Sequence, residues 1–389
     1  MANKNTQKKV SIASLFVIGL LTLVLGIVAS FGTLTYINLP LTDAAVITEE
    51  VFYSKSSNSE NTSISVENAQ MSVHFLELGN KYTGDCTYIK TDECDILIDC
   101  GSKANSVGYV ADYLNQYITD GKIEYVIITH AHQDHYAGFA TSENVSSIFD
   151  LYQCENIITF SRTNQSIANK TYNNYLRELA DEVEAGANHY TALECIEQSN
   201  GAQTTYNIGT NATMTILNSY YYDHDATTEN DYSVCTLFTC GDDNILLTGD
   251  LEKGGEEKLV ELNPTLPTVK LYKAGHHGSK TSSSNALLSV IQPEVVCVCC
   301  CAGSPEYTKT QNNQFPTQEF INNIAEYTQK VYITTLCVDY DKNEFTSFNG
   351  NIVCLFNSSG YNVVCSNNDT KLKDSEWFKN NRTCPASWQ

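Results

Sequence analysis

The sequence is poor in positive charge. It has 23 lysine and arginine residues against 45 aspartate and glutamate residues, which gives this 389-residue chain a formal net charge of −22. Nonspecific binding to DNA or to anionic lipid depends on lysine and arginine. The composition therefore does not favour nucleic acid as a partner, although it leaves a local basic groove open. The hydrophobic content of 42% predicts a packed globule rather than a disordered chain.

Charged side chains are missing from one long segment near the N-terminus, between Lys9 and Asp43. Its apolar run exceeds the roughly 20 residues that cross a bilayer as a helix. Together with the lysines before it, this run predicts a cytoplasmic basic tail over 1–9, a transmembrane signal anchor over 10–36 and a linker over 37–70. The rest of the chain would then be an extracellular domain on a single-pass cell-membrane protein. The alternative is a cleaved signal peptide and a secreted protein, but the apolar region of such a peptide is shorter, about 7–15 residues.

Cysteine is abundant, yet its pattern does not favour a structural zinc site. In VVCVCCCAG, Cys297, Cys299 and Cys300 fall on one continuous apolar run, which predicts a buried strand with cysteine as a small apolar residue. The total of fifteen is odd. An exported chain is expected to form disulfides, but the sequence does not fix their pairing.

No internal repeat organises the chain from Met71 onwards. Predicted strands and helices are mixed, with several consecutive strands early and late. This order predicts an α/β (α+β) fold of two sheets between helices rather than one doubly wound sheet. We place this domain at 71–366 and expect a polar, peripheral tail over 367–389.

Histidine is also scarce, and three of the eight histidines lie in one short stretch, THAHQDH. This stretch follows an apolar strand, and three other apolar strands end in the same way. Asp99 follows the apolar run in LIDCG, Asp250 follows the one in ILLTGD, and His276 and His277 follow the one in KLYKAGHHGS. Loops at strand ends commonly carry functional sites.

The spacing of THAHQDH suits a centre of one or two divalent metal ions. His130 and His132 are two residues apart, so both imidazoles can bind one cation, while Asp134 and His135 can reach a second. A carboxylate from another strand, such as Asp250, can bridge two ions. Imidazole and carboxylate together suit zinc first, with manganese or iron as alternatives. Three imidazoles without a cation would repel one another when protonated, which disfavours a purely structural role.

These motifs resemble the metallo-β-lactamase-fold hydrolases. The sequences LLTGD and KAGHHGSKTS most resemble motifs of the extracellular metallo-β-lactamase-like domain of the ComEC competence proteins and its free-standing relatives. The resemblance covers about residues 71–365. It implies an αββα sandwich with the metal ions at one edge between the sheets. The ligands that it implies are His130, His132, Asp134, His135, Asp250 and one of His276 and His277.

The resemblance also implies separate roles around the ligands. We favour His277 as the ligand and His276 as the residue that faces substrate, with a catalytic role. Asp99 would orient the histidine loop from behind, and Asp134 would also serve in proton transfer.

Two positions depart from the family pattern. Many members have a further histidine ligand before the bridging aspartate, and the candidates here are His224 and Asn230. Asn230 fits the ComEC-like group better, so the first metal would be held less tightly, or only one metal would be bound. The group also often has a histidine before the proline of the late helix, where this chain has Gln314 and Phe315. A proton donor or phosphate contact is therefore missing from its expected place.

GSKTSSS follows His276 and His277 and suggests substrate binding. Ser279 and Lys280 would contact an anionic group. Residues 282–284 would begin a helix whose free backbone N–H groups favour anions. A simple serine N-cap is the alternative.

Taken together, the sequence predicts a membrane-anchored extracellular hydrolase in which metal-activated water attacks a phosphoester. A phosphodiesterase or nuclease-type phosphoric ester hydrolase ranks first, because the ComEC-like group is linked to degradation of a DNA strand. Lactone, thioester or β-lactam hydrolysis by the same fold is the first alternative. A non-catalytic, metal-bearing binding module on the cell surface is the second.

Overall fold

Two mixed eight-stranded sheets form the core of the domain. The computed structural model describes residues 64–142 and 144–389. The first sheet has the strand order β16-β15-β1-β2-β3-β4-β5-β6. In that order its strands are Gly360–Cys365, Ile352–Asn357, Met71–Phe75, Thr87–Thr91, Asp95–Ile98, Lys122–Ile128, Gln153–Thr159 and Asn188–Thr191. The predicted closing hairpin is β15 and β16, and it packs against the first strand of the domain.

The second sheet has the order β14-β13-β12-β11-β10-β9-β8-β7. In that order its strands are Glu344–Ser347, Val331–Asp339, Val295–Ala302, Leu271–Lys273, Asp243–Leu247, Thr236–Cys240, Ala212–Ile216 and Thr205–Gly209. The pairs β3–β4 and β10–β11 are both parallel. The loops after parallel neighbouring strands leave a sheet at the same edge, where ligand sites of open α/β sheets commonly lie.

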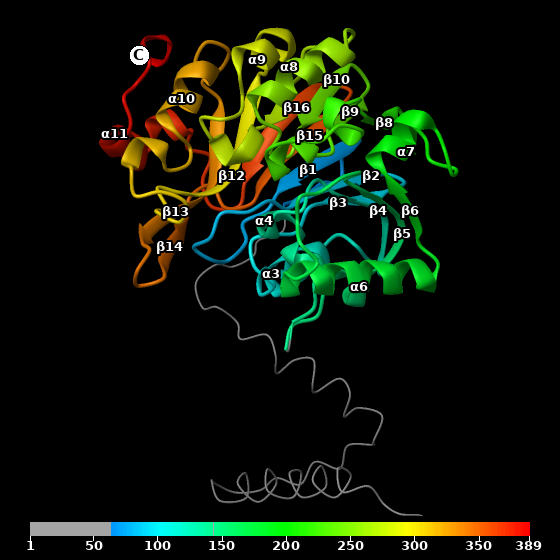
Figure 1. The fold of residues 1–389 in the computed structure, drawn as a ribbon. Coiled ribbons are helices and arrows are strands. Elements are labelled where there is room, and N and C mark those ends of the chain that lie inside the picture. Colours follow the sequence, from blue (N-terminus) through cyan, green and yellow to red (C-terminus); the bar gives the residue numbers. More distant parts are fainter. Residues whose placement is uncertain (1–63, 143) are drawn as a thin grey trace, which may run out of the picture. The chain divides into compact units, whose positions relative to one another are not determined.

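Helices cover the outer faces of the two sheets, as Figure 1 shows for α3 and α6 on the first and α8, α9 and α10 on the second. The helices are α3 (Ser106–Leu114), α4 (Gln133–Tyr136), α5 (Ile148–Leu151), α6 (Lys170–Ala185), α7 (Ala192–Glu197), α8 (Lys253–Leu262), α9 (Asn285–Ile291), α10 (Gln318–Ile324) and α11 (Glu376–Asn381). The result is a four-layer sandwich of helices, two sheets and helices, as the sequence predicted.

Strand β12 shows why the sequence favoured this fold. All eight of its residues are buried. Cys297 and Cys299 face the core between the sheets, whereas Val296 and Val298 pack under the helices of the second sheet. The sequence of a strand that is buried on both faces is typically a continuous apolar run. All fifteen cysteines lie in the described part of the chain, and none of them forms a disulfide there.

The C-terminal segment corrects one expectation. Residues 367–389 are polar in composition, but Leu372, Phe378 and Trp388 from this segment are buried in the core under the second sheet. Arg382 also donates hydrogen bonds to the backbone oxygens of Gln314 and Pro316. A few well-placed apolar residues therefore dock this segment, although its average composition suggests a peripheral tail.

The predicted signal anchor over 10–36 lies outside the described residues. Within 64–142 and 144–389, no helix is long and apolar enough to cross a membrane.

Candidate metal centre

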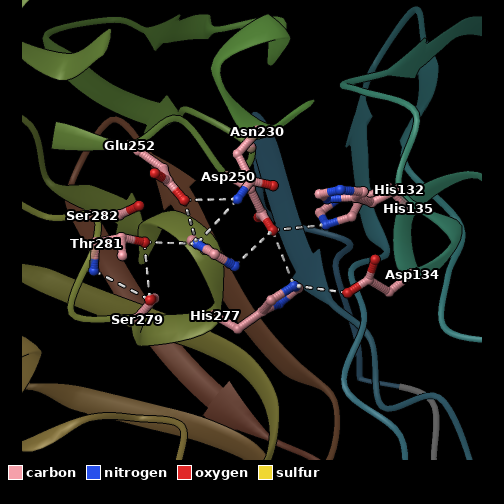
Figure 2. Close-up of polar contacts among 12 residues, drawn as sticks. His132, Asp134, His135, Asn230, Asp250, Glu252, His277, Ser279, Thr281 and Ser282 are labelled. Carbon is pink, nitrogen blue, oxygen red and sulfur yellow. Dashed lines mark hydrogen bonds and ion pairs between the residues drawn. The ribbon is translucent and has the colours of Figure 1, made fainter. Parts of the chain in front are cut away.

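Four loops bring the predicted residues together where the two sheets meet. Asp99 follows β3 and THAHQDH follows β4 in the first sheet, while Asp250 follows β10 and the adjacent His276 and His277 follow β11 in the second. Figure 2 shows His135, Asp134, Asp250 and His277 pointing toward one another from these loops.

His135 is held from behind by Asp99. Its Nδ1 lies 2.7 Å from Asp99 Oδ2 and donates to this carboxylate. The same carboxylate accepts hydrogen bonds from the backbone N–H and the hydroxyl of Thr129, at 2.8 and 2.7 Å. Asp99 therefore fixes the imidazole and leaves its Nε2 free to act as a ligand, the arrangement that a carboxylate behind a metal-binding histidine provides.

Four side-chain donors converge in front of His135. Asp250 Oδ2 lies 3.2 Å from His135 Nε2 and 3.3 Å from His277 Nε2. Asp134 Oδ2 lies 3.5 Å from the same nitrogen of His277. The Nδ1 of His277 donates to the backbone oxygen of Cys299 at 3.0 Å, which again leaves Nε2 free. We call Asp134, His135, Asp250 and His277 the four-donor group.

The electrostatics of the four-donor group suit a bound cation. Burial opposes ionisation of Asp250, but the imidazoles of His135 and His277 outweigh it and hold the pKa of this carboxyl well below its ordinary value. Burial likewise lowers the pKa of the two imidazoles, but Asp250 outweighs it and raises both pKa values well above the ordinary value. The carboxylates thus favour positive charge at the two Nε2 atoms, and a divalent cation supplies that charge when it replaces the protons.

His130 and His132 lie beside this group as a separate pair. His130 Nε2 and His132 Nδ1 are 3.1 Å apart, so both nitrogens face one point. The rings of His130 and His135 are 4.2 Å apart between centroids. Burial and the neighbouring His135 hold the pKa of His130 well below its ordinary value, which keeps this imidazole in the neutral form that binds metal. We call His130 and His132 the histidine pair.

Of the two candidates for an additional ligand, the structure favours Asn230. Its Nδ2 donates to Glu252 Oε1 at 2.9 Å, while its Oδ1 is buried with no hydrogen-bond partner in the described structure. An amide oxygen in this state is available to a cation. His224 lies elsewhere, because its ring stacks on Tyr220 and its Nδ1 lies 3.0 Å from the backbone oxygen of the same residue.

Two residues of the site were missed in the sequence, Asp85 and Lys273. Both are buried, and their side chains lie 2.5 Å apart. Asp85 Oδ1 lies 3.3 Å from His277 Nδ1, and the ammonium of Lys273 lies 3.8 Å from Asp250 Oδ1. Burial lowers the pKa of Lys273, but Asp85 and Asp250 outweigh it and raise this pKa above its ordinary value.

Asp85 supports the centre rather than joining it. One ligand atom each from Asp85, His135, Asp250 and His277 lie within 4.8 Å of one another. However, Asp85 faces the Nδ1 side of His277, whereas Asp134 and Asp250 face Nε2. The carboxylate of Asp85 is also already paired with an ammonium group. We therefore assign it, with Lys273, to the layer behind the ligands.

The two adjacent histidines after β11 face different ways. Both have left-handed backbones, with φ of 48° for His276 and 54° for His277, a strained conformation that is often found at functional sites. His277 points into the four-donor group. His276 lies at its edge, with Nδ1 3.0 Å from Thr281 Oγ1 and Nε2 3.9 Å from Asp250 Oδ2.

A polar cleft of about 510 Å³ adjoins His276. Glu252 and Thr281, which lie beside His276, contribute to its wall. The other lining residues are Thr227, Thr228, Asp231, Lys253, Gly254, Lys280 and Glu319. Lys280 therefore lines this cleft, and its contact with substrate stays a prediction.

Ser279 and the serine run play a structural part instead. Ser279 is buried, and its hydroxyl accepts a hydrogen bond from the backbone N–H of Thr281. The backbone N–H groups of Ser283 and Ser284 both donate to the buried carboxylate of Glu256, each at 2.7 Å. The buried carboxyl group of Glu256 already accepts from this helix start, so the start is not an open phosphate site. Burial raises the pKa of Glu256 to about 7.

Glycine is required where the loops below the histidines touch. A Cβ atom on Gly101 would lie 1.6 Å from the backbone oxygen of Asp134, so no side chain fits there. Hydrogen bonds join the same loops, from Asp85 N–H to Asp134 O at 3.0 Å and from Cys100 N–H to His135 O at 2.7 Å. Asp134 and His135 are therefore set by backbone contacts as well as by side chains.

The sandwich and its edge cluster are consistent with the metallo-β-lactamase fold. The sequence matches the family described as anti-Pycsar protein Apyc1 over residues 78–266. Two curated relatives match shorter segments. Recombination protein 2 of Haemophilus influenzae is 39% identical over 70 residues, and ComE operon protein 3 of Bacillus subtilis is 34% identical over 74 residues. These segments cover 18% and 19% of this chain but only 8% and 9% of the relatives. Both relatives support the resemblance to the ComEC-like group.

Several solved structures show a low similarity to this chain, and one of them, YhfI, is described as a metallo-β-lactamase-fold protein. YhfI from Bacillus subtilis has 13% identity and a TM-score of 0.40, and the match covers 68% of this chain and 95% of YhfI. The short form of human tRNase Z has 13% identity and a TM-score of 0.33, with 71% and 98% covered. CmlA, a diiron β-hydroxylase from Streptomyces venezuelae, has 14% identity and a TM-score of 0.34, with 66% and 47% covered.

Proposed function

We propose that this chain is a metal-dependent hydrolase that cleaves phosphoesters, with phosphodiesters as the first candidates. The observation that carries the proposal is the convergence of two carboxylates and two imidazoles in the four-donor group. The free Nε2 atoms of His135 and His277 are buried and have no hydrogen-bond partner in the described structure, and Asp250 Oδ1 shares this state. Buried polar atoms without partners are costly, and a divalent cation would satisfy them.

The residues fit a metal centre by donor type as well. His135, His277, Asp134 and Asp250 would hold one ion, with zinc as the first candidate and manganese as the alternative. The histidine pair and Asn230 would hold a second. A bound divalent ion supplies Lewis-acid chemistry and lowers the pKa of water.

The remaining residues would position substrate and move protons. His276 lies at the edge between the four-donor group and the polar cleft, so a substrate in the cleft meets this imidazole first. The side chain of Asp134 is 17% exposed, in contrast to 2% for Asp250, so Asp134 is the carboxylate that solvent and substrate reach. Asp134 is therefore our candidate for proton transfer.

The wall of the cleft carries three carboxylates, Asp231, Glu252 and Glu319, against two lysines, so the cleft bears on the size of the substrate rather than on the kind of ester. Lys280 and Lys253 lie on its wall beside three threonine hydroxyls. Lys253 is paired with Glu319 at 2.5 Å, which leaves Lys280 as the freer cation. A few hydroxyls and one ammonium suit a single phosphoryl group better than a long polyanion. Small or surface-attached phosphodiesters therefore rank above long DNA.

We also propose that the enzyme acts outside the cell, anchored by the apolar segment over 10–36. This part rests on the sequence alone. Labelling of an engineered cysteine in the linker by a membrane-impermeant thiol reagent on intact cells would test it, in a Cys384→Ser background that removes the exposed native thiol. A cysteine placed in residues 1–9 of the same background is the matched control.

A phosphoester panel tests the activity. The full-length chain, purified in mild detergent and loaded with zinc or manganese, should hydrolyse bis-(p-nitrophenyl) phosphate or single-stranded DNA, and a His277→Ala variant should not. If the loaded wild-type chain leaves both substrates intact, the phosphodiesterase proposal fails. Tight binding of two ions without hydrolysis of any ester in the panel would favour the binding module.

A further inference from the structure

The loop between β12 and α10 brings one tyrosine to the four-donor group. The hydroxyl of Tyr307 donates a hydrogen bond to Asp134 Oδ2 at 2.7 Å. This is the oxygen of Asp134 that lies 3.5 Å from His277 Nε2. Tyr307 as a whole is 55% exposed. Its hydroxyl thus touches a proposed ligand while much of its ring faces solvent.

Several contacts hold this loop in place. Glu306 accepts a hydrogen bond from the backbone N–H of Thr83 at 3.0 Å, close to the loop that carries Asp85. The backbone N–H of Gly303 donates to the backbone oxygen of Phe315 at 2.9 Å. Arg382 anchors the end of the loop through its bonds to Gln314 and Pro316. Tyr307 is therefore presented to the cluster from a fixed frame.

The ring next to Tyr307 brings no polar group of its own. Phe315 packs against His276 and His277, with ring centroids 5.7 Å apart in both cases, and against Tyr307 at 5.5 Å. Phe315 thus covers one side of the histidines with an apolar surface. On this side the hydroxyl of Tyr307 donates a hydrogen bond to Asp134 of the four-donor group.

We propose that Tyr307 is a catalytic residue whose hydroxyl donates a hydrogen bond to a phosphoryl oxygen of the substrate. This inference rests on the proposed function. Asp134 holds the hydroxyl at the mouth of the centre when no substrate is present. When a phosphoryl group enters, one of its oxygens takes over that hydrogen bond. The Tyr307 hydroxyl exchanges one hydrogen-bond acceptor for another. Its covalent O–H bond does not break, and no other reactant is needed.

A purely structural role for Tyr307 predicts a different outcome. If the hydroxyl only orients Asp134, its removal should weaken metal binding. If it contacts the phosphoryl group, its removal should leave metal binding unchanged and weaken phosphate binding and turnover. The two roles are therefore separated by measuring metal and phosphate on the same protein.

The test compares Tyr307→Phe with wild type in the full-length chain loaded with manganese. Tyr340→Phe is the matched control, because Tyr340 lies in the β13–β14 turn and packs its ring on Tyr82 rather than on the centre. Manganese content is measured by mass spectrometry and binding of inorganic phosphate by calorimetry. Turnover is measured with bis-(p-nitrophenyl) phosphate. The phenylalanine keeps the half-exposed ring, so the variant should fold.

For Tyr307→Phe we expect unchanged manganese content, phosphate affinity about tenfold weaker and a kcat about a hundredfold lower, the effect of losing one preorganised donor. Phosphate affinity equal to that of the wild type overturns the inference, and so does a parallel loss of manganese. If the wild type hydrolyses no phosphoester, the proposed function fails, but the phosphate titration still decides the role of Tyr307. If the wild type hydrolyses the phosphoester but binds no inorganic phosphate, the proposed function stands and the turnover of Tyr307→Phe decides: a kcat equal to that of the wild type overturns the inference.

Discussion

The four-donor group and the histidine pair lie side by side but offer a cation very different surroundings. The four-donor group combines two carboxylates with two imidazoles whose far nitrogens are fixed by Asp99 and by the backbone of Cys299. The histidine pair has two imidazoles, and the further ligand that we propose for it is the neutral amide oxygen of Asn230. Anionic donors add charge attraction to coordination, so the two positions should differ in affinity.

Support behind the two groups differs in the same direction. The four-donor group is backed by the buried pair of Asp85 and Lys273. The histidine pair is backed by hydrogen bonds to the backbone of Ala131, which lies between its two members. Glu229 accepts from the N–H of Ala131 at 3.1 Å, and Gln165 donates to its oxygen at 3.0 Å. If both groups bind metal, as we propose, the four-donor group should hold its ion tightly and the pair should hold its ion loosely.

The largest effect should follow from the residue that lies nearest to both positions. Asp250→Asn should remove tight metal binding and lower kcat/KM by roughly a thousandfold or more, because the lost metal chemistry is worth several kcal/mol. Metal analysis and hydrolysis of bis-(p-nitrophenyl) phosphate measure both effects. The control is Asp242→Asn, an exposed residue in the β9–β10 turn. Full metal content in Asp250→Asn would contradict the assignment.

A smaller and unequal effect should separate the two positions. His277→Ala should lose the tightly held ion and about a hundredfold in kcat/KM. His132→Ala should keep this ion and lose the loose one, and its kcat/KM should fall about tenfold. A tenfold loss in rate corresponds to about 1.4 kcal/mol. Equilibrium dialysis against manganese counts the ions in each variant. Equal losses of metal and of kcat/KM in the two variants would show that the two positions do not differ in affinity. Full activity in His132→Ala would exclude the proposed active site.

The buried pair should matter more for stability than for the chemistry. Removal of one partner of a buried ion pair costs about 3–5 kcal/mol, because the other charge is left uncompensated. Lys273→Met should therefore lower the free energy of unfolding by about this amount and weaken the tight ion about 10–100-fold. Denaturant titration measures the first effect and metal titration the second.

A second substitution sharpens this test. The double variant Asp85→Asn/Lys273→Met should lose less stability than the sum of the two single variants, because no unpaired charge remains. Lys342→Met removes an exposed lysine that pairs with Asp339 and serves as the control, with no measurable change expected. Additive losses in the double variant would show that Asp85 and Lys273 do not act as a pair.

The smallest effect should come from improving the weaker position. Asn230→His replaces the amide ligand that we propose with an imidazole and should tighten the loose ion about tenfold, without changing the tight one. Calorimetric titration with zinc would show the change in the weaker of two binding phases. The control is His224→Ala, which should change neither phase. If His224→Ala instead abolishes the weaker phase, the further ligand is His224 and our assignment is wrong.

Much of this arrangement could be predicted because it depends on local sequence. Apolar strands that end in aspartate or histidine placed Asp99, His130, Asp250 and His277 at strand ends, and parallel pairing brings such ends to one edge. The continuous apolar run of β12 predicted a buried strand, and all of its residues are buried.

The missed residues depend on contacts far apart in the sequence. Lys273 is a single charge in an otherwise apolar strand, a signal that could have marked it, but its partner Asp85 lies 188 residues earlier by their numbering and no local pattern joins them. Tyr307 lies in a loop without periodicity and meets Asp134 only in the folded chain. The C-terminal segment was misjudged because three buried residues, not its average polarity, decide where it docks.

Lys273 also sets the charge balance of the whole centre. The ionised carboxylates of Asp85, Asp99, Asp134 and Asp250 and the ammonium of Lys273 leave three negative charges in excess when the imidazoles are neutral. One divalent ion leaves a single negative charge, which repels a phosphoester anion, whereas two divalent ions reverse the sign and attract it. The second, weaker ion would then act as a switch for substrate capture, and activity would follow the free metal concentration.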